Sequence, residues 1–325
     1  SILSGGDIGN IQANIDAQTL QLGGTQTVTG NKTFSGTVSI SGATSLTGTL
    51  QVRDPWVDVR SYASFATAIS TIGVTVTHLL IPNSQAVATN VTVPANVTLW
   101  FIKGGSLAIA TGITVTIQGS IVSEEQQIFS LTGTGLVALN SNLITEIHLN
   151  WWGATGDGTT DDTTAIQNCF NAAINATYKT KIKCAAAKYL ITGSGLSLPY
   201  VSGKTGLHLE GVGSQRGASG NNNLGTIFYK TGVGTQCLRL GDPEDTNEYH
   251  DCPTIKNISF LGTSDTNYGL YFYVNYGSFD NINVVGFHID LLHRGTAKYT
   301  SCNFEDGVVD NVTFTNWSDD SYRTV

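Results

Sequence analysis

Residues 151–170 read WWGATGDGTTDDTTAIQNCF, and they decide how the rest of the chain is interpreted. A glycine-rich turn leads into Asp161 and Asp162, whose carboxylates can accept hydrogen bonds from the first unpaired N–H groups of a helix. Apolar residues then recur every three or four positions, which predicts an amphipathic α-helix near residues 162–176. These residues are Ile166, Cys169, Phe170, Ala173 and Ile174. A single such helix amid strand-like sequence indicates that it caps a β-solenoid.

Four short motifs follow one another in this stretch. They are Trp152-Gly153-Ala154, Gly156-Asp157-Gly158, Thr160-Asp161-Asp162-Thr163 and Ala165-Ile166-Gln167. Together they resemble the opening motif of the pectate-lyase-like right-handed β-helix family, which includes phage tailspikes, capsule depolymerases and bacterial polysaccharide lyases and hydrolases. The resemblance implies an all-β fold, a right-handed parallel β-helix of the pectin-lyase type. We expect Asp157, Asp161 and Asp162 to be structural, the last two as helix caps; a catalytic role is the alternative.

Composition favours a long β-structure with many turns over a helical bundle or a disordered chain. Of the 325 residues 37 are glycine, and only 12% are charged. This length can bury a core and hold two or three domains. The net charge of −8 argues against nucleic acid as a partner, because binding phosphates requires clustered lysine and arginine. Methionine is absent, so we expect the chain to be trimmed or to be a piece of a longer protein.

The five cysteines are widely spaced, and no two form a C-x-x-C pair. We therefore expect free thiols packed in a core, with no metal site, no disulfide framework and no cofactor. Residues 1–30 lack the basic start and apolar run of a signal peptide, and no apolar run is long enough to span a membrane. The expectation is assembly in a reducing cytoplasm without membrane insertion.

Three segments are predicted along the chain. Residues 1–55 resemble the shaft segments of phage tail fibres, since residues 30–36 read GNKTFSG and short Thr/Ser/Gly alternations follow. A flexible linker is the alternative. Strands this short cannot bury a core in a monomer, which favours several copies wrapped together. Residues 56–150 are predicted to hold an entry region with short coils, and residues 151–325 the main β-helix, incomplete at its C-terminus because no capping element closes the stack.

Internal repeats indicate stacked coils. In residues 87–131, five apolar positions beginning at Val91 match five others beginning at Leu107 at an offset of 16, which predicts that residues 16 apart stack. An antiparallel β-meander with accidental spacing is the alternative. Later, Asn257, Asn281 and Asn311 open similar units, 24 and 30 residues apart, and a ladder of their side-chain amides is expected at one bend. Residues 206–211 are interpreted as an earlier coil of this series.

The candidate catalytic residues are Asp290, Glu305 and Asp306. Cleavage of a glycan requires two carboxyl groups on one outward face, and neighbouring coils would bring Asp290 and Glu305 together. The motifs of polygalacturonase-type hydrolases and calcium-dependent pectate lyases do not occur, so a depolymerase activity rests on the family resemblance alone.

The candidate glycan-binding residues are Tyr271, Tyr273, His293 and Arg294. Aromatic faces stack on sugar rings, and alternation along a strand would place both tyrosines outside if Phe272 lies in the core.

These features predict a phage tailspike or tail-fibre protein that recognises host surface polysaccharide, with depolymerisation as an activity implied by resemblance. Such a protein would be a homotrimer in the virion tail, in contact with other tail or baseplate proteins. Two alternatives stay open: a secreted bacterial polysaccharide lyase or glycoside hydrolase acting as a monomer, and a purely structural virion protein.

Overall fold

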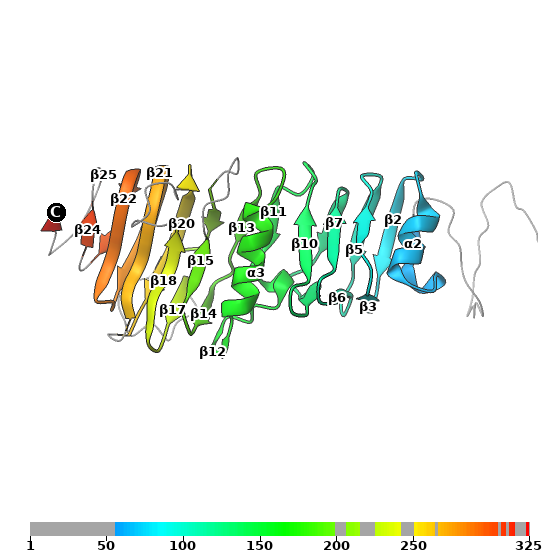
Figure 1. The fold of residues 1–325 in the computed structure, drawn as a ribbon, viewed down its shortest axis with the longest axis horizontal. Helices are drawn as coiled ribbons and strands as arrows, with labels where there is room; N and C mark the ends of the chain where they lie inside the picture. The colour runs from blue at the N-terminus through cyan, green and yellow to red at the C-terminus, as the bar shows by residue number, and fades with distance from the viewer. Residues whose placement is uncertain are drawn as a thin grey trace, which may run out of the picture. The chain divides into compact units, whose positions relative to one another are not determined.

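The computed structural model describes residues 56–198, 206–214, 225–241, 250–263, 266–304, 307–309, 312–315 and 323–324 (Figure 1). Side chains are described as far as Phe304, except at 266–267 and 294–296. All of these residues belong to one of two units of the chain, residues 49–325. The predicted shaft segment, residues 1–55, lies outside the described residues.

The first series of strands passes through three parallel sheets in turn. From β2 onward the chain places one strand in each sheet and then returns to the first, so that the sheets have the orders β1-β2-β5-β8, β3-β6-β9 and β4-β7-β10. The strands are β1 (Trp56–Asp58), β2 (Thr77–Ile81), β3 (Ser84–Val87), β4 (Val91–Val93), β5 (Val97–Phe101), β6 (Ser106–Ile109), β7 (Thr114–Ile117), β8 (Ser120–Ser123), β9 (Phe129–Leu131) and β10 (Leu136–Leu139).

One circuit takes more residues than the sequence repeat indicated. Leu79 pairs with Leu99, and Val91 pairs with Val115, 20 and 24 residues apart. The predicted stacking of residues 16 apart is wrong: Val91 lies in β4 and Leu107 in β6, which belong to different sheets. Inward and outward residues alternate in the same way in the strands of every sheet. A repeat of apolar positions can therefore relate two strands of the same circuit as well as two strands of successive circuits. All pairings among the described strands are parallel, which excludes the β-meander.

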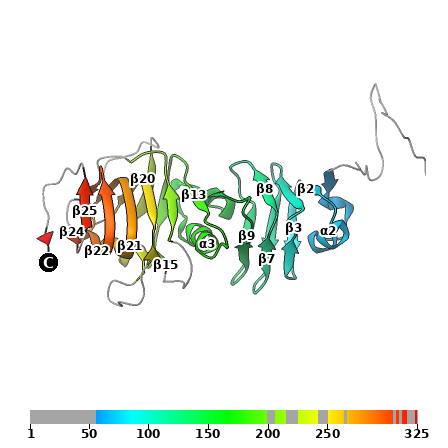
Figure 2. The same cartoon turned by 90° about the horizontal axis from the view of Figure 1, so that it is seen from above.

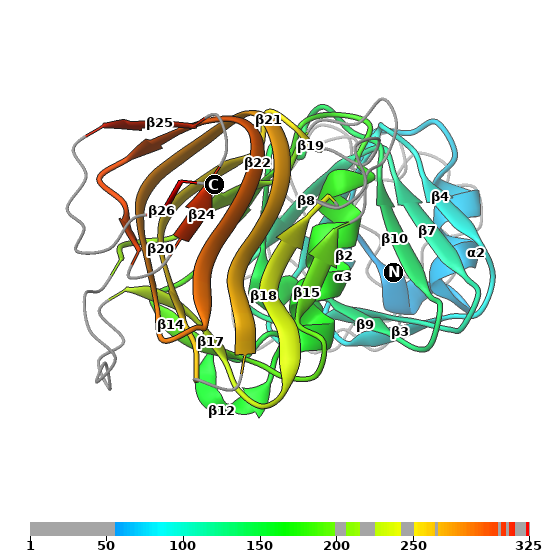
Figure 3. The ribbon, with the colours of Figure 1, turned by 60° about the vertical axis from the view of Figure 1, so that its left-hand side comes forward.

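The second series forms one curled sheet of parallel strands (Figure 3). Its long strands β20, β21 and β22 follow the curl around the core, so each pairs with several shorter strands. The strands are β11 (Glu146–His148), β12 (Asp157–Asp161), β13 (Lys181–Lys183), β14 (Ala187–Ile191), β15 (Leu196–Leu198), β16 (His208–Glu210), β17 (Thr226–Lys230), β18 (Gly234–Leu240), β19 (His250–Asp251), β20 (Thr254–Leu261), β21 (Thr266–Val285), β22 (Ile289–Thr300), β23 (Asn303–Phe304), β24 (Gly307–Val309), β25 (Val312–Thr315) and β26 (Arg323–Thr324). Strand β16 lies within residues 206–211, where an earlier coil was expected, and pairs in parallel with β13 and β20.

The predicted helix is α3 (Thr163–Ile174), which follows the 3₁₀-helix η2 (Leu149–Trp152) and β12. It buries Ile166, Cys169, Phe170 and Ile174, while Ala173 is half-buried. The helix contacts β10 on one side and β15 on the other, so it lies between the two series of strands (Figures 1 and 2). The helix therefore covers the junction of two stacks instead of a free end.

A second helix, which the sequence analysis did not predict, covers the start of the first series. Helix α2 (Phe65–Ile72) follows the 3₁₀-helix η1 (Val59–Ser61) and contacts β3 and β4. The Ser64 hydroxyl accepts a 3.1 Å hydrogen bond from the Thr67 N–H group and caps the helix. The apolar side chains of α2 face the strands and shield their inward residues from water: Phe65, Ala68, Ile69 and Ile72 are buried.

Inward residues of successive circuits stack to form the core. In the sheet that starts at β11, one column contains Ile147, Ile182, Leu209 and Ile255, each at most 1% exposed. No single circuit can bury such a column, so its stability comes from the stacking itself. Four of the five free cysteines, all except Cys252, are also buried.

Two of the three residues of the expected amide ladder, Asn257 and Asn281, are in contact at one bend. The Asn281 side-chain amide donates a 2.9 Å hydrogen bond to the Asn257 Oδ1 atom, and both residues have left-handed backbones with φ of 50° and 59°. Asparagine tolerates this conformation better than most residues do. Asn283 pairs with Asn303 on the next strand, so Ser301 is the residue that corresponds to Asn281 there. Ser301 also has a left-handed backbone, with φ of 54°. Asn311 lies outside the described residues.

The ladder predicts a graded loss of stability at Asn281. Asn281→Gly keeps the left-handed backbone but removes the amide bond and the 2.6 Å bond from the Ser214 hydroxyl, which costs about 1–2 kcal/mol. Asn281→Ala adds a backbone penalty of about 1 kcal/mol. Urea unfolding followed by circular dichroism measures both. Equal stability of the two variants would contradict the backbone part of this account.

Candidate functional site

Four strands of the second series share a polar-apolar-polar pattern. They read Glu146-Ile147-His148, Lys181-Ile182-Lys183, His208-Leu209-Glu210 and Thr254-Ile255-Lys256. The middle residue points into the core, and the two flanking residues point outward. Because the strands pair in register, the outward residues form two columns on one surface. We call this surface the charged face; it comprises Glu146, His148, Lys181, Lys183, His208, Glu210, Thr254 and Lys256.

A network of ion pairs connects the first three strands. The Lys181 Nζ atom lies 3.4 Å from Glu146 Oε2 and 2.7 Å from Glu210 Oε2. The Lys183 Nζ atom lies 2.8 Å from Glu146 Oε1. Two carboxylates from strands β11 and β16 are thus held around one ammonium group on the strand between them. Exposed pairs of this kind add little stability, so the network mainly fixes the positions of the charges.

The charges set the protonation of this network. Burial alone would raise the pKa of the Glu146 carboxyl, but hydrogen bonds from Lys183 and Lys181 and their charges bring it below its ordinary value. The hydrogen bond to Glu210 raises the pKa of Lys181. Both groups are therefore ionised at neutral pH. A general acid for glycoside hydrolysis needs a raised pKa, so Glu146 is suited to accept hydrogen bonds and not to protonate a leaving group.

A hollow of about 150 Å³ lies over β13, β16 and β20. It is smaller than the ~300 Å³ or more of a pocket that encloses a small-molecule ligand. It suits one substituent of a polymer that runs along the surface. Lys256 makes no ion pair with any described residue, so its ammonium group remains available at the edge of the hollow. The lining residues are Lys181, His208, Leu209, Glu210, Thr254 and Lys256.

His208 contributes an uncharged polar group to the hollow. Burial, and secondarily the charge of Lys179, lowers the pKa of His208 to about 4, so its imidazole is neutral at neutral pH. Its Nε2 atom is covered and has no hydrogen-bond partner. A buried polar atom without a partner carries a free-energy cost, which a ligand hydroxyl or carboxylate could relieve after a small movement of the ring.

The structure does not place Asp290 on an outward groove. Its side chain is 1% exposed, and its Oδ1 atom accepts a 3.4 Å hydrogen bond from the Phe287 N–H group. The expected exposure of Asp290 on an outward face is therefore wrong, while its pairing with Glu305 stays a prediction. Glu305 and Asp306 lie outside the described residues, and their candidacy stays a prediction.

His293 lies in the core and not on a glycan-binding surface. It pairs in register with Phe272, which is fully buried, and it is itself 1% exposed. Its Nδ1 atom lies 2.7 Å from the Tyr299 hydroxyl, also inside.

The two tyrosines lie opposite Phe272 as the alternation predicted, but they are not a free sugar-binding surface. Tyr271 is only 8% exposed. The ring centre of Tyr268 lies 4.8 Å from that of Tyr271, and the Arg239 guanidinium lies 5.7 Å from the Tyr271 ring centre. The prediction of an exposed Tyr271 is therefore wrong. Tyr273 is half-buried, and the Arg294 side chain lies outside the described residues.

Asp161 and Asp162 have separate structural roles. Asp161 accepts a 3.0 Å hydrogen bond from the Thr163 N–H group, at the first residue of α3. Asp162 occupies the N-cap position, but its carboxylate makes no capping bond. It is 1% exposed and accepts hydrogen bonds from the N–H groups of Thr155 and Gly156, at 2.7 and 3.0 Å. The predicted helix cap at Asp162 is thus a loop clamp.

Asp157 stabilises the turn before the helix. Hydrogen bonds from the backbone of Thr160 and Thr159 hold the pKa of the Asp157 carboxyl well below its usual range. Because the folded-state pKa is lowered, its stabilising contribution is present above the unfolded-state pKa and is lost as the pH falls towards the folded-state value. Gly156 in the same turn has φ 65°, and a Cβ atom there would lie 2.5 Å from the Ala187 Cβ atom, so the motif requires glycine.

Sequence reasoning missed the residues of the charged face. The signal was available in the four polar-apolar-polar triplets, since each has lysine, histidine or glutamate at a flanking position. The separations between triplets vary, however, and the apolar repeat offers no register that would align them. Only the strand pairing shows that Lys181 lies between Glu146 and Glu210.

Comparison of the chain with known proteins finds no matching family, no matching curated relative and no matching solved structure. No helix among the described residues is long and apolar enough to cross a membrane. Within the same residues no group of three or more His, Cys, Asp and Glu side chains is placed to hold a metal ion. Function is therefore inferred from the residues and their geometry.

Proposed function

We propose that this chain is the right-handed parallel β-helix part of a phage tailspike or tail-fibre protein, and that it binds host surface polysaccharide through the charged face. The hollow over β13, β16 and β20 is the observation that carries the proposal. It presents the free ammonium group of Lys256, the carboxylate of Glu210 and the imidazole of His208 within one small concavity. Such mixed donors and acceptors match the hydroxyl and charged substituents of a glycan.

The circuit of the first series supports the β-helix assignment. Strands pass through three parallel sheets in a fixed order, and parallel strands joined by short connections in this way form a coil. The motif of residues 152–167 adds the resemblance to phage tailspikes. A homotrimer in the virion tail, in contact with other tail or baseplate proteins, is part of the proposal.

Binding without cleavage is the form of the activity that the charged face favours. Its carboxylates surround Lys181, and the lowered pKa of Glu146 does not suit a general acid. Depolymerisation would require carboxyl groups elsewhere, for example the predicted Glu305 and Asp306. A secreted lyase or hydrolase and a purely structural virion protein remain the rival functions.

Two measurements on the full chain separate these functions. An array of purified bacterial capsule and O-antigen polysaccharides tests binding, and chromatography of the incubated glycans tests cleavage. Light scattering during size exclusion tests the trimer. A monomer that releases oligosaccharides would favour the secreted enzyme, and a trimer that binds none of the glycans would favour the structural protein.

Substitution of Lys256 tests the hollow itself. Lys256→Ala removes the only lining ammonium group without an ion pair to a described residue and is expected to weaken glycan binding roughly tenfold, since a hydrogen bond to a charged group contributes about 1.5–3 kcal/mol. Lys188→Ala is the matched control: this lysine lies on β14, in another part of the sheet, over the Tyr229 ring at 3.9 Å. Isothermal titration calorimetry with the polysaccharide found on the array measures both. Equal weakening by the two variants would contradict a specific role of the hollow.

A further inference from the structure

Two tryptophans and a histidine form an aromatic cluster on the outer face of the first sheet. The cluster consists of Trp56 on β1, His78 on β2 and Trp100 on β5. All three occupy outward positions, because the residues next to them in sequence, Val57, Leu79 and Leu99, point inward. The Trp56 ring centre lies 4.8 Å from that of His78 and 4.7 Å from that of Trp100. Trp56 is the outermost ring and is 37% exposed. We call these three residues the aromatic platform.

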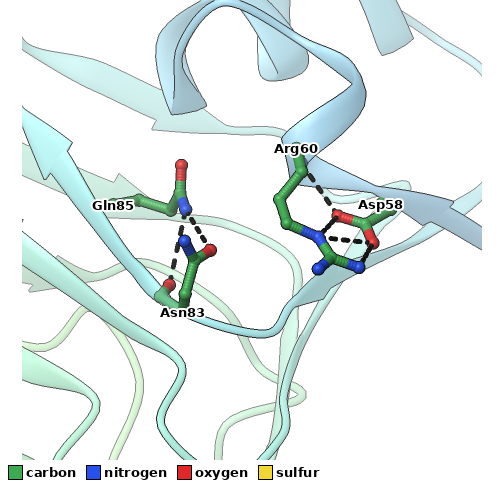
Figure 4. Close-up of polar contacts among 4 residues, drawn as sticks. All are labelled: Asp58, Arg60, Asn83 and Gln85. Atoms are coloured by element: carbon green, nitrogen blue, oxygen red, sulfur yellow. Dashed lines mark hydrogen bonds and ion pairs between the residues drawn. The ribbon is translucent and has the colours of Figure 1, made fainter. Parts of the chain in front are cut away.

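Hydrogen-bonding groups border the platform along the same strands. On one side, His78 pairs with Thr98 on the next strand, and Thr98 pairs with Ser120 on the strand after that. The hydroxyl oxygens of Thr98 and Ser120 are 2.8 Å apart. On the other side Asp58 accepts hydrogen bonds from the Arg60 guanidinium (Figure 4). The bond from Arg60 lowers the pKa of Asp58, so its carboxylate is ionised at neutral pH.

The second pair of residues in Figure 4 lies at the start of β3, which belongs to another sheet. The Gln85 side-chain amide donates a 2.7 Å hydrogen bond to the Asn83 Oδ1 atom. Both pairs in the view are local, each joining residues two positions apart.

The size of the platform favours a sugar over a protein partner. Beside Trp56, three large apolar side chains at outward positions of these strands or next to their ends are more than a third exposed, namely Val76, Ile102 and Val122. A stable protein interface needs about 800 Å² and 20–30 residues from each partner, which these few side chains do not supply. A pyranose ring has an apolar face of C–H groups and a rim of hydroxyls, which matches indole rings bordered by hydroxyl and carboxylate groups.

The platform and the charged face occupy the same place in the circuit. Strand β11 follows β10 as β8 follows β7 and β5 follows β4, so in chain order it corresponds to β5 and β8, although it begins a separate sheet. Successive circuits advance by about 4.8 Å along the stacking direction. One polymer that lies along this direction can therefore contact both surfaces.

We propose that the aromatic platform is a second carbohydrate subsite, and that it takes an uncharged pyranose ring of the polymer whose polar substituents occupy the hollow. The inference rests on the proposed function. Trp56 is the stacking surface, and Trp100 and His78 hold its ring in place from beneath.

Fluorine NMR of the full chain tests the subsite directly. The protein is labelled with 5-fluorotryptophan, and Trp56→Phe and Trp100→Phe assign the two resonances. The probes are the polysaccharides that bind on the array, together with maltohexaose, cellohexaose and chitohexaose. The resonances of Trp56 and Trp100 are expected to shift, while those of Trp151 and Trp152, which are buried, stay in place. Trp56→Ala is expected to weaken binding about tenfold, and Trp56→Phe much less.

The outcomes separate this inference from the proposed function. Glycan binding that depends on Lys256 and leaves the Trp56 and Trp100 resonances unmoved overturns the subsite alone. Shifted resonances with an unchanged affinity of Lys256→Ala support the subsite and overturn the hollow. Unmoved resonances with every probe, in a protein that binds no polysaccharide, overturn both. Because Trp56 is the outermost ring, Trp56→Ala should keep the circular dichroism of the native chain.

Discussion

Phe228→Ala is expected to lower the free energy of unfolding by about 3–5 kcal/mol, the cost of emptying a large buried site. Phe228 is fully buried on β17 and stands between two aromatic rings of the neighbouring strands. Its ring centre lies 5.7 Å from that of Tyr189 and 5.4 Å from that of Phe260. The Phe170 ring of α3 lies 6.4 Å away. Truncation would thus weaken both the stacking of circuits and the attachment of the helix.

Urea unfolding followed by tryptophan fluorescence measures this loss. Phe228→Leu is expected to cost less, about 1–2 kcal/mol, since it keeps most of the buried volume. Lys188→Ala on the adjacent strand is the control, with a loss of about 0.5–1 kcal/mol for its contact with the Tyr229 ring. If Phe228→Ala were as stable as this control, the aromatic stack would not carry the core.

Asp162→Ala is expected to cost about 3 kcal/mol, although the residue lies at a helix start where a cap would contribute only ~1 kcal/mol. The carboxylate accepts hydrogen bonds from the Thr155 and Gly156 N–H groups and from the Thr155 hydroxyl. Alanine would leave the buried Gly156 N–H group without a partner and would remove both bonds from Thr155, and an unpaired buried donor costs more than its bond contributes.

The neighbouring Asp161 offers a matched control for this prediction. Asp161→Ala removes a bond to the Thr163 N–H group and one to the Thr192 hydroxyl, both near the surface, and should cost about 1 kcal/mol. Thermal unfolding of the two variants gives the comparison. An Asp161 variant less stable than the Asp162 variant would mean that capping, and not the clamp on residues 155–156, is the main role of the acidic pair.

The candidate site shows where sequence reasoning succeeded and where it failed. Alternation placed Phe272 inside and Tyr271 on the opposite side of the strand, which the structure confirms. It could not predict that Arg239 of the neighbouring strand β18 lies over the Tyr271 ring, because that contact depends on which strands pair. Asp290 was expected on an outward groove because neighbouring coils would bring it close to Glu305, but its side chain is buried. Side-chain exposure depends on neighbours that the local pattern does not contain.

The helix, the parallel coils and the Asn257–Asn281 ladder could be read from local residue patterns. Caps, apolar spacing and asparagines at bends act over a few residues, so their signal stands in the chain itself. The length of a circuit, the junction position of α3 and the ion pairs around Lys181 were decided by tertiary structure. Each depends on which strands lie side by side. The inward–outward alternation is the same in every strand, so the local sequence does not determine which strands pair.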